Sequence, residues 1–239
     1  MIVHVYDTGK LASLAAAHLF AAQILEKPHT VMGLATGSTP VDTYKQLAQW
    51  FKEGLLDFSE CISFNLDEYV GLSPDHVCSY RRFMEENLFN HINMKETHLP
   101  SGTATNLKAE CRRYDKAIQK AGGIDIQFLG IGHNGHIGFN EPDSVFSHGT
   151  HVVKLTESTI QANKRYFDSE DQVPRQAISL GIGGIMQARK IVLVALGEGK
   201  AKAIRQMVKG NADPQCQASI LKLHPQVTVL LDEAAASLL

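Results

Sequence analysis

Short apolar runs alternate along the chain with longer stretches of helical periodicity. Runs of strand length occur at 2–6, 31–35, 61–66, 124–129, 151–155, 191–196 and 227–231. Helical patterns lie between them at 10–26, 40–52, 79–92, 107–121, 156–167 and 200–209. Several strands are near-continuous Val and Ile runs, so both of their faces are expected to be covered. The pattern predicts βαβ units, an α/β fold with a mostly parallel central sheet, and one domain over 1–239.

Two helix boundaries can be predicted from local residues. Thr39 is expected to cap the helix that follows it, with Pro40 at the first helical position. Gly122 and Gly123 are expected to end the helix at 107–121. In open α/β sheets the ligand binds beyond the carboxyl ends of the strands. The loops that follow strands are therefore the places to look for chemistry.

Composition narrows the class of protein. The 239 residues carry 23 basic and 25 acidic side chains, a balance that argues against a nucleic-acid binder. No apolar run approaches the ~18 residues of a membrane span, and the first residues lack the basic start of a signal peptide. The four cysteines are widely separated and form no CxxC pair, which predicts a reducing, cytoplasmic location.

The loop at 33–40 reads Gly-Leu-Ala-Thr-Gly-Ser-Thr-Pro. Its small residues allow close approach of the backbone, the hydroxyls of Thr36, Ser38 and Thr39 can donate, and a helix N-terminus follows. These features predict a phosphate-binding loop, with a simple tight turn as the alternative. A nucleotide P-loop is excluded because the Gly-Lys-Ser/Thr ending is absent.

Two further loops carry candidate proton-transfer groups. Asp67 and Glu68 end an apolar strand, so one can point into a cleft while the other points away; a helix cap or a surface acid pair is the alternative. The stretch 130–142 contains a literal GxGxxG, but no periodic helix follows, which argues against dinucleotide binding. It also holds His136, which Asn134 and Glu141 can orient as a proton shuttle.

Several other charged or basic residues have either a binding role or a plain surface role. Lys200 lies at a strand-to-helix turn and Arg165 on the helix at 156–167, so both are candidate phosphate partners. A metal site could use the HxxH pairs at 133–136 and 148–151, but no cysteine is near and a glycine-rich loop gives no fixed ligand geometry. His133, His148 and His151 are interpreted as surface residues.

Three stretches, in this order, carry a family resemblance: Ala-Thr-Gly-Ser-Thr-Pro at 35–40, Phe-Asn-Leu-Asp-Glu-Tyr-Val-Gly-Leu at 64–72, and Gly-His-Ile-Gly-Phe-Asn-Glu-Pro at 135–142. The chain closely resembles the glucosamine-6-phosphate deaminase (isomerase) family over essentially its whole length. The resemblance implies a Rossmann-like three-layer sandwich related to phosphogluconolactonase and ribose-5-phosphate isomerase. It also implies conversion of glucosamine 6-phosphate and water to fructose 6-phosphate and ammonia in amino-sugar catabolism, with no cofactor.

The resemblance assigns roles to individual residues. His136 opens the sugar ring, with Glu141 and Asn134 orienting it. Asp67 carries the proton from C2 to C1. The implied phosphate ligands are Thr36, Gly37, Ser38, Thr39, Arg165 and Lys200. The segment at about 155–176 is implied to be a mobile lid, and Glu68 and Tyr69 receive no chemical step.

The chain departs from the family at two points. Asn134 stands where many members have Asp, so we expect activity with a shifted pH profile. The chain is also short at its C-terminus, and 147–154 keeps few of the basic groups found in hexameric members that N-acetylglucosamine 6-phosphate activates. The hypothesis is an unregulated, monomeric enzyme, with a homo-oligomer left open.

Three other functions fit the sequence less well. A sugar-phosphate lactonase of the same fold does not explain the Asp67 motif well. A non-catalytic sugar-phosphate sensor has no need of Asp67, His136 and Glu141 together, and no DNA-binding segment precedes Ile2. A metal aminohydrolase would require activity that a chelator abolishes. The expected partner is a small sugar phosphate, with neither nucleic acid nor membrane.

Overall fold

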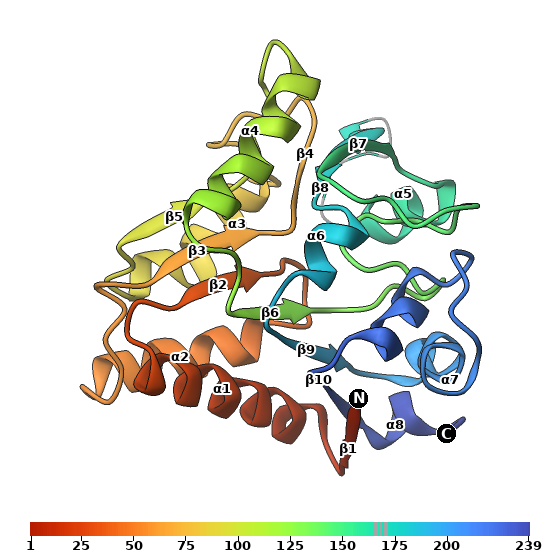
Figure 1. The fold of residues 1–239 in the computed structure, drawn as a ribbon, viewed down its shortest axis with the longest axis horizontal. Helices are drawn as coiled ribbons and strands as arrows, with labels where there is room; N and C mark the ends of the chain where they lie inside the picture. Colours follow the sequence, from red (N-terminus) through yellow and green to blue (C-terminus); the bar gives the residue numbers. More distant parts are fainter. Residues whose placement is uncertain (165–166, 168, 170–171) are drawn as a thin grey trace.

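A computed structural model describes residues 1–164, 167, 169 and 172–239, apart from the side chains of 158, 162 and 163. In these residues a seven-stranded sheet has the order β1-β10-β9-β6-β2-β3-β5, with every pair parallel (Figure 1). Its strands are β1 Ile2–Tyr6, β2 Val31–Leu34, β3 Ile62–Asn65, β5 Glu96–His98, β6 Ile126–Leu129, β9 Lys190–Ala195 and β10 Val227–Asp232. The predicted α/β fold with a mostly parallel sheet is confirmed.

The strand order reverses direction between β2 and β6. On one side of this point the sheet contains β2, β3 and β5, in order towards the edge. On the other side it contains β6, β9, β10 and β1, in order towards the opposite edge. The loops that leave β2 and β6 therefore diverge and leave a crevice between them at the carboxyl ends of the strands, the usual ligand position in such sheets.

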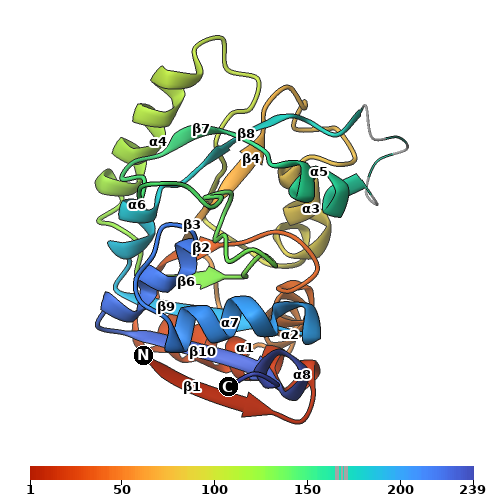
Figure 2. The ribbon, with the colours of Figure 1, turned by 90° about the vertical axis from the view of Figure 1, so that its right-hand side faces the viewer.

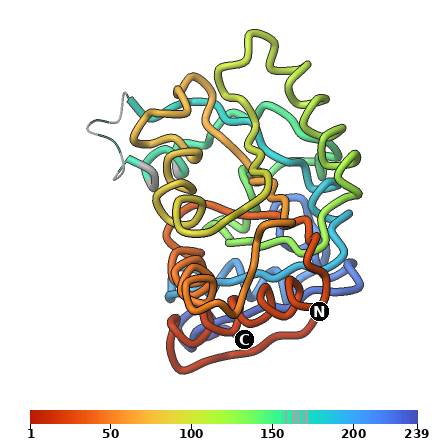
Figure 3. Tube along the Cα trace, turned by 90° about the vertical axis from the view of Figure 1, so that its left-hand side faces the viewer, coloured from red at the N-terminus to blue at the C-terminus, as the bar shows by residue number. Residues whose placement is uncertain are grey.

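Helices cover both faces of this sheet (Figures 1 and 3). The α-helices are α1 Gly9–Glu26, α2 Val41–Lys52, α3 Tyr80–Asn87, α4 Leu107–Lys120, α5 Glu157–Asn163, α6 Ile182–Met186, α7 Ala201–Lys209 and α8 Glu233–Ala236. Phe20 of α1 and Tyr44 of α2 both pack on Phe128 of β6. Phe64 of β3 points to the other face, where Tyr114 of α4 meets it edge-on. Among the described residues, no helix combines the length and apolar character needed to cross a bilayer.

A second, antiparallel sheet lies beside α4, away from α1 and α2 (Figure 2). It consists of β4 Asp67–Tyr69, β8 Gln176–Ser179 and β7 His151–Lys154. Asp67 pairs with Ser179 and Tyr69 with Ala177. The sequence pattern predicted β7 but neither β4 nor β8, because three- and four-residue strands with mixed polarity carry little periodicity.

Two boundary predictions were wrong. Helix α2 begins at Val41, and Pro40 occupies the N-cap position, so Thr39 is not the cap. The predicted helix at 79–92 is interrupted at Leu88, which has φ −145°, and continues as the 3-10 helix η1 Phe89–His91. Two further 3-10 helices, η4 Glu198–Lys200 and η5 Gln217–Leu223, flank α7.

Candidate active site

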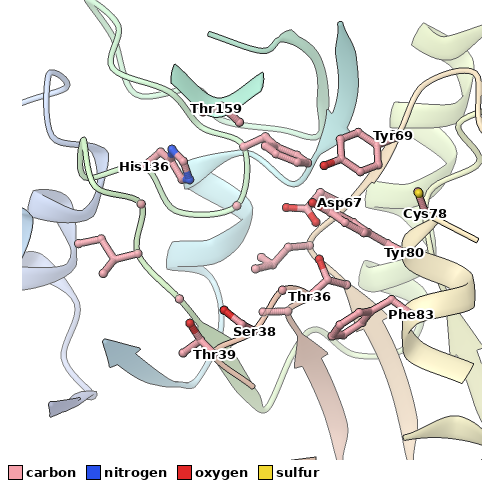
Figure 4. Close-up of a pocket in the computed structure, with 18 of the residues that line it drawn as sticks. Thr36, Ser38, Thr39, Asp67, Tyr69, Cys78, Tyr80, Phe83, His136 and Thr159 are labelled. Carbon is pink, nitrogen blue, oxygen red and sulfur yellow. The ribbon is translucent and has the colours of Figure 1, made fainter. Parts of the chain in front are cut away.

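A cavity of about 530 Å³ opens in the crevice where β2, β3 and β6 end. The loops after these strands, the first turn of α3 and the start of α7 form its walls (Figure 4). The polar residues that line it include Thr36, Ser38, Thr39, Asp67, Tyr69, Tyr80, His133, Asn134, His136, Thr159 and Lys200. Loops far apart in the sequence therefore converge on one space.

The loop after β2 lies along one side of the cavity, and Thr36, Gly37, Ser38 and Thr39 all line it (Figure 4). The hydroxyl of Tyr44 pins the start of this loop from behind: it accepts from Ala35 N at 3.1 Å and donates to Ala35 O at 2.6 Å. The N-terminal end of α2 follows directly, with its positive dipole end. The Thr39 side chain, which does not cap the helix, lines the cavity. The arrangement suits an anion.

Asp67 lies near Thr36, at the point where the chain passes from β3 into β4. Its side chain points into the cavity (Figure 4) and is 6% exposed. Burial, with a smaller contribution from the charge of Glu68, raises its pKa to about 8. A carboxyl group with a pKa near neutrality can both take up and release a proton.

Glu68 points away from the cavity. Its carboxylate accepts the backbone N–H of Tyr69 at 2.9 Å, of Tyr80 at 3.0 Å and of Arg81 at 3.0 Å. The helix-cap alternative therefore describes Glu68, while Asp67 faces the cavity. The two adjacent acids have separate tasks.

His136 faces Asp67 across the cavity from the loop after β6 (Figure 4). Its Nδ1 lies 3.2 Å from Oε2 of Glu141, and the Asn134 side-chain amide donates to the same oxygen at 2.8 Å. With Nδ1–H donating to the carboxylate, Nε2 is the nitrogen left to accept a proton. Glu141 lies behind the imidazole and is not itself in the cavity wall.

Among the described residues, four side chains donate hydrogen bonds to Glu141. Besides His136 and Asn134, the hydroxyls of Thr156 and Thr159 at the start of α5 donate to Oε1. Burial alone would raise the pKa of this carboxyl group, but the hydrogen bonds and the imidazole charge outweigh it and lower the pKa to about 2. Glu141 therefore stays ionised at neutral pH and can stabilise a protonated His136.

The glycine-rich loop folds closely around the imidazole. Gly132 N donates to His136 O at 2.9 Å. A Cβ at Gly132 would lie 2.4 Å from His136 Cε1, so a side chain there would displace the ring. At Gly130 the nearest atom to such a Cβ is 3.9 Å away. The glycine at 132 thus makes room for His136.

Aromatic residues to which neither the sequence pattern nor the family resemblance assigned a chemical role form the remaining wall. Tyr80 stacks on Phe139 with ring centroids 5.9 Å apart, and Tyr69 meets Phe139 at 5.6 Å. Phe83 joins them in the lining. Ser79 caps α3 by accepting from Arg82 N, but a helical pattern does not reveal which turn of a helix reaches the cavity.

The charged phosphate candidates have different outcomes. Lys200 lines the cavity at the end of η4, but Arg165 lies outside the described residues. His133, interpreted as a surface residue, is exposed and also lines the cavity. Within the described parts of the chain, no group of three or more His, Cys, Asp and Glu side chains could hold a metal ion.

Comparison with known proteins agrees with this geometry. The sequence profile of the family "Glucosamine-6-phosphate isomerases/6-phosphogluconolactonase" matches residues 8–230. The glucosamine-6-phosphate deaminase of Thermoanaerobacter pseudethanolicus is 57% identical over 95% of this chain and 90% of its own length. That of Halothermothrix orenii is 51% identical over 100% of both chains. The chain belongs to this family, as the sequence resemblance predicted.

Solved structures point the same way. A structure described as a monomeric glucosamine-6-phosphate deaminase superposes with a TM-score of 0.98 at 47% identity over 100% of both chains. The 6-phosphogluconolactonase of Leishmania guyanensis has a TM-score of 0.78 at 21% identity, covering 98% of this chain and 97% of its own. The second similarity shows a shared fold, which confirms the predicted relation to the phosphogluconolactonases.

Proposed function

We propose that this chain is a glucosamine-6-phosphate deaminase, which converts glucosamine 6-phosphate and water to fructose 6-phosphate and ammonia in amino-sugar catabolism. One observation carries the proposal: a single cavity holds a buried carboxyl group, Asp67, opposite an imidazole backed by Glu141, beside a hydroxyl-rich loop at a helix N-terminus. The names of the relatives at 51–57% identity agree with this enzyme class.

Ring opening is the first step. A proton must leave the anomeric hydroxyl and arrive at the ring oxygen, so that the C1–O5 bond breaks and an aldehyde forms. His136 accepts the first proton at Nε2 and delivers one to the ring oxygen, while ionised Glu141 stabilises the imidazolium between the two transfers. Asn134 helps to fix the position of the Glu141 carboxylate by donating a 2.8 Å hydrogen bond to it.

Isomerisation and hydrolysis follow. Ionised Asp67 removes the proton from C2 while the C1 oxygen takes up a proton from water, which gives an enolamine. Asp67 then returns its proton to C1 and the nitrogen releases one to water, which gives the ketimine at C2. Water adds to the C=N carbon, and ammonia leaves to give the ketone. Each of these steps is a proton transfer or a hydrolysis, and none requires an oxidant, a metal or an organic cofactor.

The phosphate anchors the sugar away from the reacting carbons, which turns binding energy into orientation. Its proposed ligands are Thr36, Gly37, Ser38, Thr39, Lys200 and Arg165. We also propose one domain over 1–239 in which about 155–176 acts as a lid. A monomer agrees with the name of the structure at TM-score 0.98. The proposed location is the cytoplasm, with no nucleic-acid or membrane partner.

The decisive experiment incubates EDTA-treated protein with glucosamine 6-phosphate and measures ammonia and fructose 6-phosphate together. We expect equimolar products from the wild type and a loss of at least about 10³-fold in kcat for Asp67→Asn. Asp57→Asn, which changes an exposed carboxylate outside the cavity, serves as the control.

Three results would overturn the proposal. Hydrolysis of a phosphogluconolactone without ammonia release from the amino sugar would indicate a lactonase. Tight sugar-phosphate binding without products would indicate a sensor. Activity that EDTA abolishes and a divalent metal restores would indicate a metal aminohydrolase.

A further inference from the structure

The proposed reaction gives no task to Glu68, although this side chain is as buried as Asp67 beside it. Glu68 is 4% exposed. Both of its carboxylate oxygens are engaged: Oε1 accepts from the N–H groups of Tyr69 and Tyr80, and Oε2 accepts from that of Arg81. A buried carboxylate held by three backbone donors is a specific structural element, not a solvated charge.

These contacts join two separate elements. Tyr69 belongs to β4, whereas Tyr80 and Arg81 are the first two residues of α3. The next N–H groups of α3 have local acceptors, because Arg82 N donates to Ser79 Oγ at 3.1 Å. Glu68 thus supplies the acceptors that the start of α3 does not find in its own sequence, and its charge is favourable at a helix N-terminus.

The first turn of α3 forms part of the cavity wall. Tyr80 and Phe83 both line the cavity, and Tyr80 lies beside Asp67 and Thr36 (Figure 4). The ring of Tyr80 packs against Tyr69 with centroids 4.7 Å apart. A shift of this turn would therefore move the wall that faces the sugar on the Asp67 side.

We infer that Glu68 is a positioning residue: its carboxylate fastens the first turn of α3 to β4 and so fixes Tyr80 relative to Asp67. The kinetic consequence rests on the function proposed above, whereas the fastening itself does not. A geometric tolerance well below 1 Å around reacting carbons makes such fastening important for rate.

Charge gives Glu68 a second influence on the site. Its negative charge is the second cause, after burial, of the raised pKa of Asp67. The other groups facing this pair are Arg81 of α3 on the Glu68 side, and the buried hydroxyls of Tyr44, Tyr80 and Tyr114 on the Asp67 side. His136 faces Asp67 across the cavity. Removing the Glu68 charge therefore makes Asp67 a stronger acid.

Amide hydrogen exchange tests the fastening without reference to activity. In Glu68→Gln we expect the N–H groups of Tyr80 and Arg81 to exchange about tenfold faster than in the wild type. Glu110→Gln is the matched control, because Glu110 is 7% exposed and accepts Ser101 N at 2.8 Å outside the cavity. Unchanged exchange in Glu68→Gln would overturn the inference. If Glu68→Gln does not fold, Glu68→Asp decides, with reduced protection expected at the same two amides.

The pH dependence of kcat/KM tests the effect on the reaction. In Glu68→Gln we expect the acid limb to move to lower pH by about one unit and kcat at the plateau to fall about tenfold. Glu68→Asp keeps the charge, so the acid limb of its kcat/KM profile is expected to stay near that of the wild type. A residue with only a structural role would lower activity without moving the acid limb of the kcat/KM profile. That result would contradict an effect of the Glu68 charge on Asp67. An inactive wild type would refute the proposed reaction, while the exchange result would still decide the fastening.

Discussion

Asp67 and Glu141 are buried carboxyl groups of the same site, 6% and 8% exposed, yet their pKa values move in opposite directions. On the Asp67 side burial dominates and a neighbouring negative charge adds to it. On the Glu141 side His136, Asn134 and Thr159 donate to the carboxylate and outweigh burial. Similar burial thus accompanies a carboxyl group that can exchange a proton near neutral pH, Asp67, and a carboxylate that is ionised at neutral pH, Glu141. The hydrogen-bond donors and the imidazole around Glu141 account for the difference.

After Asp67→Asn, neutralising Glu141 should have the largest effect on the reaction. Glu141→Gln keeps the shape of the side chain but cannot stabilise a protonated His136. We expect kcat to fall by about 10²-fold to 10³-fold with KM changed by less than about threefold. Steady-state assays of ammonia release measure this. Glu110→Gln is the control, and equal losses in both variants would show a general defect of folding.

Stability should respond with opposite signs on the two walls. The folded pKa of Asp67 is about 8 against an ordinary 3.8, so its ionisation destabilises the fold progressively as pH rises from about 4 to 8. Glu141, with a folded pKa of about 2 against 4.5, contributes stability above about pH 4.5 that is lost as pH falls towards 2.

Denaturant unfolding at several pH values measures this contrast. At pH 8 we expect Asp67→Asn to raise the free energy of unfolding by about 3 kcal/mol and Glu141→Gln to lower it by about 2 kcal/mol. At pH 4 Asp67→Asn should differ little from the wild type. A decrease in stability for Asp67→Asn at pH 8 would contradict a raised pKa.

A smaller effect is expected from crowding the imidazole. Gly132→Ala places a Cβ against the His136 ring, whereas Gly130→Ala meets its nearest atom at 3.9 Å. We expect Gly132→Ala to lower kcat about 10-fold to 50-fold and Gly130→Ala less than threefold. Assays of the two variants side by side measure this, and equal losses would indicate that the loop backbone, not the ring position, is responsible.

Asn134→Asp should have the smallest effect. Asn134 donates to Glu141 Oε2 at 2.8 Å, and an aspartate cannot donate when ionised. The second carboxylate would raise the pKa of Glu141 and add negative charge near His136. We expect a change in kcat below about tenfold with a shifted pH profile of kcat/KM. An unchanged profile would show that solvent screens this position.

The residues that follow strands with a continuous apolar run could be predicted from the sequence. Asp67 and His136 follow such strands, and strand ends meet at one edge of a parallel sheet. Tyr80 and Phe83 could not be predicted in this way, because the orientation of a short helix depends on Glu68, a contact twelve residues distant. Strands β4, β5 and β8 were missed because three or four residues of mixed polarity carry too little periodicity to indicate a strand.

The link between α5 and the proton-transfer apparatus has a mechanical consequence. Thr156 and Thr159 stand in the first turn of α5, and both hydroxyls donate to the carboxylate behind His136. Withdrawing this turn would take two donors from Glu141 and raise its affinity for a proton. In the position that the structure shows, α5 thus supplies two of the hydrogen bonds that favour the ionised form of the carboxylate behind His136, so a helix outside the central sheet contributes to the charge at the site.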